Sequence, residues 1–177
     1  DEVSIIFNEN VKSTEITEVD NIYVKAILNE SEIAHSVAYA TNASHPAKTE
    51  SHIDLNSQSF TIEMWIKYSS AGTILTHGTA DNKFVIAVDD NACLNITVND
   101  KSMKSLKTLP KDKWTYLAVA VNQGSDFATL SAVCAYDEFE DNLFVDETAP
   151  LYKGNGVITV GEGLEAEIHE LTLWNYA

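Results

Sequence analysis

The stretch Ser59-Phe60-Thr61-Ile62-Glu63-Met64-Trp65-Ile66-Lys67 decides the fold, because a large apolar residue occupies every second position within it. The even-numbered positions from Phe60 to Ile66 would share one face of a strand, whereas Glu63 and Trp65 would point the opposite way. Period two over this length indicates a β-strand with one face in a hydrophobic core. Outward from this stretch, the same alternation continues along most of the chain, and sustained helical periodicity is almost absent.

Short polar breaks separate the expected strands and carry turn residues, as in Asp89-Asp90-Asn91 and Lys153-Gly154-Asn155-Gly156. Strands of this kind favour an antiparallel sandwich, because a parallel architecture would need crossover helices for which there is no room. Residues 35–44 could instead form a short helix. The expected strands are residues 3–7, 22–28, 33–40, 51–55, 60–67, 73–76, 84–88, 93–98, 114–121, 128–136, 142–145, 157–160 and 167–174.

Residues 59–67 resemble the "sFTIE-x-W-[IV]-K" strand of laminin-G-like domains, which belong to the concanavalin A-like lectin/glucanase superfamily. Four later stretches resemble further motifs of that family in the same order, namely Gly72-Thr73-Ile74-Leu75 and residues 113–119, 156–161 and 168–177. Two features depart from the family pattern. His169 stands where the closing strand usually has Asp, and residues 130–136 run into acidic residues without the usual Gly-containing turn.

This resemblance implies an all-β fold, an antiparallel two-sheet jelly-roll β-sandwich. It implies one domain over residues 1–177, with residues 1–58 supplying strands that complete the sandwich and residues 59–177 carrying the motifs. Family members are mostly adhesive, sugar-binding or spacer modules outside the cell, so an extracellular or cell-surface location is expected. The chain starts at Asp1 without Met, and we expect it to be a piece of a longer secreted or surface protein.

The charge of the chain excludes some classes of partner. Eleven basic residues, all of them Lys, stand against 27 Asp and Glu, and the formal net charge is −16. Nucleic-acid binding needs many cationic contacts with phosphate, so a nucleic-acid partner is not expected. Anionic membranes are disfavoured for the same reason, and no apolar stretch approaches the roughly 20 residues that span a bilayer. A glycan or a protein remains as the expected ligand.

The three tryptophans are the first candidates for ligand binding. In their expected strands, Trp65, Trp114 and Trp174 all take the parity opposite to the aliphatic stripe. One hypothesis is an aromatic platform on an outer sheet face, where sugar rings could stack. The alternative is that all three lie under loops or in a second layer of core, since Trp is usually well buried.

The second candidate is an acidic turn, Asp137-Glu138-Phe139-Glu140-Asp141. Its carboxylates are the oxygen ligands that Ca²⁺ prefers, although the spacing does not match an EF-hand loop. The sequence therefore suggests a metal site at Asp137, Glu138, Glu140 and Asp141, and a calcium-dependent function. A solvated acidic loop is the alternative, because charge runs are commonly exposed.

A third group, Glu165-Ala166-Glu167-Ile168-His169-Glu170, superficially resembles the "E-x-D-x-x-E" strand of jelly-roll glucanases. Glu165 and Glu167 could share a face, but Glu170 would need a bulge to join them. Retaining glycoside hydrolysis needs two carboxyl groups about 5–5.5 Å apart. In the laminin-G-like relatives the same segment is structural, so catalysis is the lesser hypothesis and no catalytic residue is assigned.

Two cysteines, Cys93 and Cys134, lie in separate expected strands. They could form one cross-strand disulfide or remain as two buried free thiols, and the sequence leaves both alternatives open. Taken together, these features predict a non-catalytic binding or adhesion module that recognises a glycan. A structural spacer or protein-interaction domain of a larger surface protein is the alternative, and a glycoside hydrolase comes third.

Overall fold

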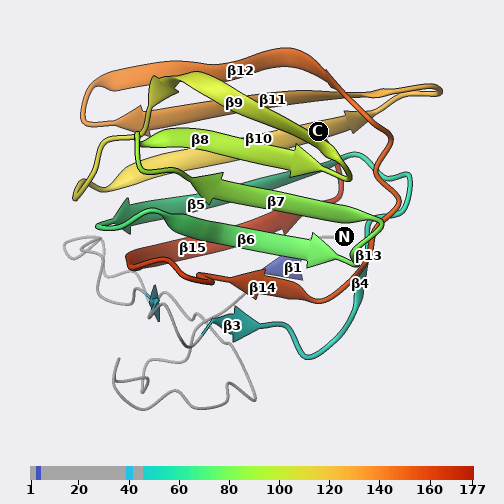
Figure 1. Ribbon diagram of the computed structural model, residues 1–177, viewed down its shortest axis with the longest axis horizontal. Coiled ribbons are helices and arrows are strands. Elements are labelled where there is room, and N and C mark those ends of the chain that lie inside the picture. The colour runs from blue at the N-terminus through green and yellow to red at the C-terminus, as the bar shows by residue number, and fades with distance from the viewer. Residues whose placement is uncertain (1–2, 5–38, 42–45) are drawn as a thin grey trace.

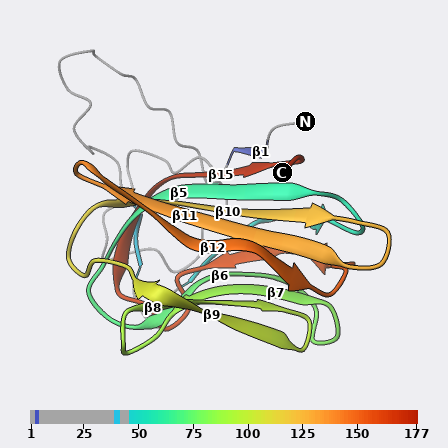
Figure 2. The same ribbon diagram turned by 90° about the horizontal axis from the view of Figure 1, so that it is seen from above.

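The computed structural model describes residues 3–4, 39–41 and 46–177, and two β-sheets pack face to face in it (Figures 1 and 2). Within these residues all secondary structure is strand and turn, and every pair of neighbouring strands is antiparallel. The predicted all-β, antiparallel two-sheet jelly-roll β-sandwich is therefore confirmed.

The stretch at residues 59–67 forms β5 (Phe60–Tyr68), in the middle of a seven-stranded sheet. Its neighbours are β15 (Ala166–Trp174) on one side and β10 (Thr115–Gln123) on the other. Beyond β10 the order continues through β11 (Ala128–Tyr136) to β12 (Phe139–Ala149) at the edge. At the opposite side, β1 (Val3–Ser4) and β2 (Tyr39–Ala40) both pair with β15.

The second sheet has six strands among the described residues. Their order is β3 (Ala47–Lys48), β14 (Ile158–Val160), β6 (Gly72–Gly78), β7 (Lys83–Val88), β8 (Cys93–Val98) and β9 (Lys101–Thr108). A small two-stranded sheet joins β4 (Ile53–Asp54) to β13 (Asn155–Gly156). Short strands before residue 59 thus pair with strands of the motif-bearing part in both large sheets.

The hydrophobic core lies between the two large sheets. Along β5 the side chains alternate strictly between buried and half-buried, as the sequence predicted. Phe60 packs edge-on against Phe84 of the opposite sheet, with 5.2 Å between ring centroids, and Tyr152 fills the space beside both rings. Gly154 permits this packing, because a Cβ atom there would lie 2.0 Å from the Tyr152 hydroxyl. Alternation therefore decides which side chains point into the core.

Several expected strands differ from the observed ones. The prediction had no strand over β9, and residues 142–145 were only the middle of the longer β12. The expected strand 157–160 begins at Ile158 instead. The expected strand 22–28 and the possible helix over residues 35–44 lie largely outside the described residues, although Tyr39–Ala40 is a strand.

The two cysteines do not form the disulfide that was one of the two alternatives, because both thiols are free and buried. Cys93 opens β8 in the six-stranded sheet, whereas Cys134 lies on β11 in the seven-stranded sheet. Packed sheets stand about 10 Å apart, and a disulfide needs Cα atoms within about 7 Å of each other. Their positions on different sheets are the physical reason that they remain separate.

Candidate functional site

The outer face of the seven-stranded sheet carries an aromatic cluster built around Trp65. Because β5 buries its even-numbered residues, Trp65 points away from the core and is half-buried. Strand register places Tyr116 of β10 and His169 of β15 directly beside it. The rings of Trp65 and Tyr116 lie 5.6 Å apart between centroids, in a tilted arrangement. The predicted parity of Trp65 is therefore confirmed, and Tyr116 belongs to the same surface.

Trp174, at the end of β15, joins this cluster through Glu63. Its indole Nε1 donates a hydrogen bond to Glu63 Oε2 at 3.0 Å, and its ring lies 5.5 Å from that of Tyr176. Burial, together with the charge and hydrogen bond of Glu63, raises the pKa of Tyr116 to about 12. Glu63 is thus a carboxylate held among aromatic rings.

A β-bulge in β15 makes this arrangement possible. His169 lies opposite Trp65 and Thr172 opposite Glu63, so β15 uses one more residue than β5 over this interval. The backbone of Glu170 turns into the left-handed region, with φ of 52°. After the bulge, Leu171 and Leu173 enter the core while Trp174 points outward. The glucanase-like motif would need a bulge to bring Glu170 to the face of Glu165 and Glu167, and a bulge is present. Its effect is to shift the inward-facing positions from even-numbered to odd-numbered residues.

Trp114 is half-buried and lies just before β10 begins, rather than within the strand as expected. Two members of the cluster, Trp65 and Trp174, were predicted from the sequence as binding residues. Tyr116, Tyr176 and the linking carboxylate Glu63 were not. Parity alone placed Glu63 and Tyr116 on this face, but only the register between β5, β10 and β15 brings the side chains together.

The four carboxylates of the acidic turn do not converge. The turn joins β11 to β12, and Asp137 pairs with Lys113 while Asp141 pairs with Lys107 at 2.5 Å. Glu138 and Glu140 are exposed. Across the described part of the chain, no three His, Cys, Asp or Glu side chains gather closely enough to hold a metal ion. The residues at this turn therefore do not fit a calcium site, because two of the four carboxylates already have lysine partners.

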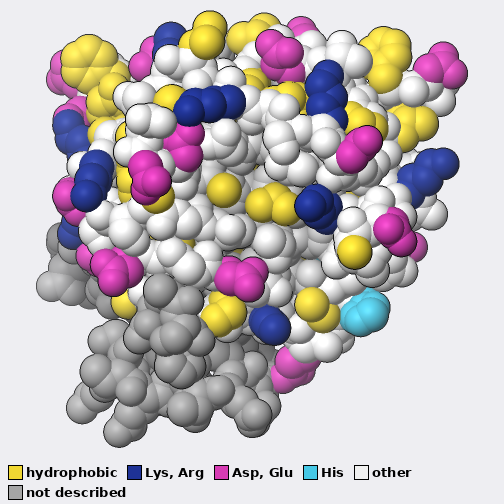
Figure 3. Space-filling model, in the orientation of Figure 1, with side chains coloured by type: hydrophobic (Ala, Val, Ile, Leu, Met, Phe, Trp, Pro, Cys, Tyr) yellow, Lys and Arg dark blue, Asp and Glu magenta, His cyan; other side chains and the backbone are white. Residues whose placement is uncertain are grey.

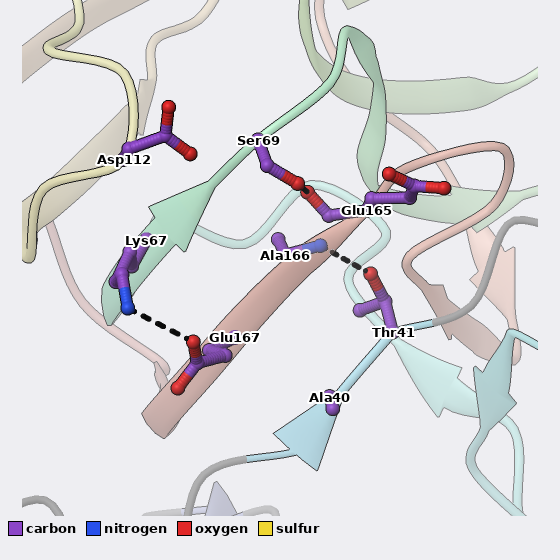
Figure 4. Close-up of a pocket in the computed structure, with 8 residues that line it drawn as sticks. All are labelled: Ala40, Thr41, Lys67, Ser69, Asp112, Glu165, Ala166 and Glu167. Carbon is purple, nitrogen blue, oxygen red and sulfur yellow. Dashed lines mark hydrogen bonds and ion pairs between the residues drawn. The ribbon is translucent and has the colours of Figure 1, made fainter. Parts of the chain in front are cut away.

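A cleft of about 470 Å³ lies where the end of β5 meets the start of β15, and sequence analysis did not anticipate it (Figure 4). Lys67 crosses it to pair with Glu167 at 3.1 Å. Thr41 closes one side, since its hydroxyl accepts a hydrogen bond from the Ala166 backbone N–H at 2.8 Å and donates to the Leu164 carbonyl at 2.6 Å. Thr41 is far away in sequence, which is why no local pattern could reveal the cleft.

Two carboxylates of the glucanase-like motif line this cleft. Glu167 forms an ion pair with Lys67. The Glu165 side chain points away from this pair in the close-up (Figure 4). Glu165 is anchored by its backbone, whose carbonyl accepts a hydrogen bond from the Ser69 N–H at 2.8 Å. Glu170 lies on the bulge, outside the cleft lining. The three carboxylates therefore do not converge on one point.

The chain is similar to several solved structures, one of them with a TM-score above 0.5. A Bacteroides ovatus protein named for carbohydrate binding aligns with a TM-score of 0.51 at 13% identity, over 78% of this chain and 43% of that one. The heptameric SAP-like pentraxin from Limulus polyphemus aligns with a TM-score of 0.46 at 14% identity, over 73% of this chain and 69% of the pentraxin. The GH43 BlXynB protein from Bacillus licheniformis aligns with a TM-score of 0.45 at 11% identity, over 67% of this chain and 28% of that protein.

The family comparison agrees with the motifs in the sequence. No curated protein sequence matches this chain significantly. No helix among the described residues is long and apolar enough to cross a membrane. A laminin-G family model, described as the concanavalin A-like lectin/glucanases superfamily, matches residues 41–177. With that match over most of its length, the chain belongs to the concanavalin A-like lectin/glucanases superfamily as a laminin-G-like domain.

Proposed function

We propose that this domain is an extracellular, non-catalytic glycan-binding module that uses the aromatic face of the seven-stranded sheet. The observation that carries the proposal is the cluster of Trp65, Tyr116 and Trp174 around the Glu63 carboxylate. The apolar faces of sugar rings stack on aromatic side chains, and a carboxylate accepts hydrogen bonds from sugar hydroxyls. The cluster combines aromatic rings and a carboxylate on three adjacent strands, β10, β5 and β15.

The charge of the chain narrows the class of glycan. With a formal net charge of −16 and lysine as its sole permanent cation, the domain would repel acidic polysaccharides. We therefore infer a neutral glycan as the ligand. The Bacteroides ovatus protein, which is named for carbohydrate binding and shares the fold, is in keeping with this proposal.

A glycan array with the purified chain, probed with and without Ca²⁺, tests the proposal. We expect neutral glycans to bind, and Trp65→Ala to weaken binding of the best ligand by about two- to tenfold, because stacking contacts contribute about 0.5–1.5 kcal/mol each. Phe127→Ala is the matched control, since Phe127 is 52% exposed and lies on a turn away from the cluster. Circular dichroism of each variant must show an intact sandwich.

The outcomes separate the alternatives. Loss of binding in the Phe127 variant as well as the Trp65 variant would argue against the aromatic face as the site. Absence of any bound glycan in either condition would favour a structural spacer. Calcium dependence stays a prediction, and binding that is equal with and without Ca²⁺ would contradict it.

The hydrolase alternative has less support. The Glu165 and Glu167 side chains diverge, and Glu167 is occupied by Lys67, whereas retaining hydrolysis needs two carboxyl groups that flank one bond. Release of reducing sugar from a soluble β-glucan would revive this alternative, provided that Glu165→Gln or Glu167→Gln abolished it.

A further inference from the structure

The outer edge of β12 is open. β12 is eleven residues long and ends the seven-stranded sheet, pairing with β11 on one side; no other strand of the described residues pairs with it. An unpaired strand edge presents backbone N–H and C=O groups that can accept another strand. Over residues 139–142 the pairing with β11 runs without interruption, so this part of the edge is regular.

Large apolar side chains are exposed beside this edge. Phe139 and Val145 of β12 are each 65% exposed, and Leu106 of β9 is 100% exposed. β9 ends the six-stranded sheet and lies alongside β12, as the contacts of Lys107 with Asp141 and of Lys101 with the Thr148 carbonyl record. In Figure 3 hydrophobic side chains alternate with charged ones along this rim of the molecule. Exposed apolar surface rimmed by charge marks an interaction site.

The charge of the edge is strongly acidic. Between Asp137 and Glu147 the chain has six carboxylates and no lysine. Lys113 and Lys107 neutralise Asp137 and Asp141, whereas the exposed Glu138, Glu140 and Glu147 have no ion pair among the described residues. A partner that docks here must therefore bring positive charge.

The same charge argues against a second copy of this chain. Two such edges side by side would place like carboxylates together, and each chain already has a formal net charge of −16. The neighbouring edge strand β9 carries Lys101, Lys104 and Lys107, which is a common way to block strand addition. β12 lacks that protection over residues 139–142. Its pairing with β11 shifts register between Asn142 and Phe144 and again between Phe144 and Glu147, where Ser131 Oγ bonds Asp146.

We propose that residues 139–142 of β12 dock an extended, basic segment of a partner protein, which adds to the seven-stranded sheet as a further strand. Lysine or arginine side chains of the segment would face Glu138, Glu140 and Glu147. Its apolar side chains would cover Phe139 and Leu106. Backbone hydrogen bonds would supply affinity, and the alternating side chains would supply specificity.

A peptide of about ten residues that alternates lysine and valine is the probe, with a glutamate–valine peptide as its counterpart. Backbone-amide NMR of the full chain would locate binding, and a titration at low and high salt would measure it. We expect shifts confined to the amides of residues 139–142 and of β9. We expect Phe139→Ser and Glu140→Lys each to weaken binding about tenfold, because the first removes an apolar contact and the second replaces an attracting charge with a repelling one.

The matched controls are Phe127→Ser and Glu162→Lys, which alter an exposed aromatic and an exposed acid away from this edge. Both should bind like the unaltered chain. Equal losses in the controls would mean diffuse attraction between opposite charges and would overturn the proposal, as would a complete lack of binding. Self-association of the unaltered chain in sedimentation, lost in the Phe139 variant, would instead assign the edge to a second copy. Trp65→Ala should leave peptide binding unchanged, which separates this result from the glycan proposal.

Discussion

At the scale of single residues, His77 is the most constrained polar side chain of the core. It is 2% exposed, and its Nε2 lies 2.8 Å from the Ile53 carbonyl, which can only accept. Nε2 therefore carries the proton of a neutral ring, and Nδ1 faces the Tyr152 hydroxyl at 2.7 Å. The hydroxyl has a second acceptor within reach, the His77 carbonyl at 3.0 Å. This network ties β6 to β4 and to the loop that follows β12.

His77 should make the stability of the domain depend on pH. Burial lowers the pKa of His77 from its ordinary 6.5, an effect that the Ile53 and Gly156 hydrogen bonds and Asp54 oppose and His52 reinforces. The unfolded chain then binds a proton below about pH 6.5 that the folded chain does not. The free energy of unfolding should therefore fall as the pH drops through 6.5 toward the lower native pKa.

Urea unfolding between pH 5.5 and 7.5 measures this effect, at up to about 1.4 kcal/mol per pH unit for one proton. The variant His77→Gln should be less stable at neutral pH and should have a flatter pH dependence across the same range. The difference between the two pH profiles reports on His77. Parallel pH profiles for the two proteins would contradict the assignment.

At the scale of elements, the bulge in β15 shows how one residue determines the faces of a strand. Ile168 is buried before the bulge, and Leu171 and Leu173 are buried after it, a spacing that plain alternation cannot produce. The extra residue also directs Trp174 outward to Glu63. A bulge therefore couples the packing of the core to the assembly of the aromatic face.

Deleting Glu170 should remove the bulge without exchanging the faces of the strand end. Leu171 would then follow His169 in plain alternation, and Thr172 would keep its place opposite Glu63, so Leu171 and Leu173 would still point inward. We expect the deletion variant to fold and to melt close to the unaltered chain, as circular dichroism would record. Glu170→Gly keeps the bulge and relieves the left-handed backbone at φ 52°, so it should also retain the fold. A deletion variant that does not fold would disprove this account.

The strand β9 shows where sequence patterns fail at this scale. Its buried face is marked only by Met103 and Ser105, two residues apart. The other side chains are polar or lysine, apart from the exposed Leu106. Ser105 is buried because its hydroxyl accepts a hydrogen bond from the Leu94 N–H at 2.9 Å and donates to the Lys107 carbonyl at 2.6 Å. A serine that satisfies backbone groups does not register as an apolar position. The alternation was therefore present but invisible in hydropathy.

At the scale of the whole molecule, the net charge of −16 opposes compactness. Four of the described lysines pair with Asp89, Asp137, Asp141 and Glu167, but these pairs are partly exposed and contribute about 0–1 kcal/mol each. Repulsion among the remaining carboxylates should outweigh them. Salt weakens both the ion pairs and the repulsion, so the larger of the two decides whether salt raises or lowers the stability.

Raising NaCl from about 20 mM to about 500 mM at pH 7 should therefore raise the melting temperature by a few degrees. Near the isoelectric point of about 4.4, where the net charge vanishes, the same addition should have little effect. A melting temperature that falls with salt at pH 7 would mean that the ion pairs dominate the repulsion.

The fold class, the central strand, and the outward parity of Trp65 and Trp174 could be predicted from the chain alone, because alternation with period two is a local property. Which side chains meet depends on the tertiary structure. Register brings Tyr116 beside Trp65, the bulge aims Trp174 at Glu63, and separate sheets keep Cys93 from Cys134. Lys107 and Lys113 reach the acidic turn from segments far away in sequence. Contacts of this kind depend on how strands pair and sheets stack, which no single segment encodes.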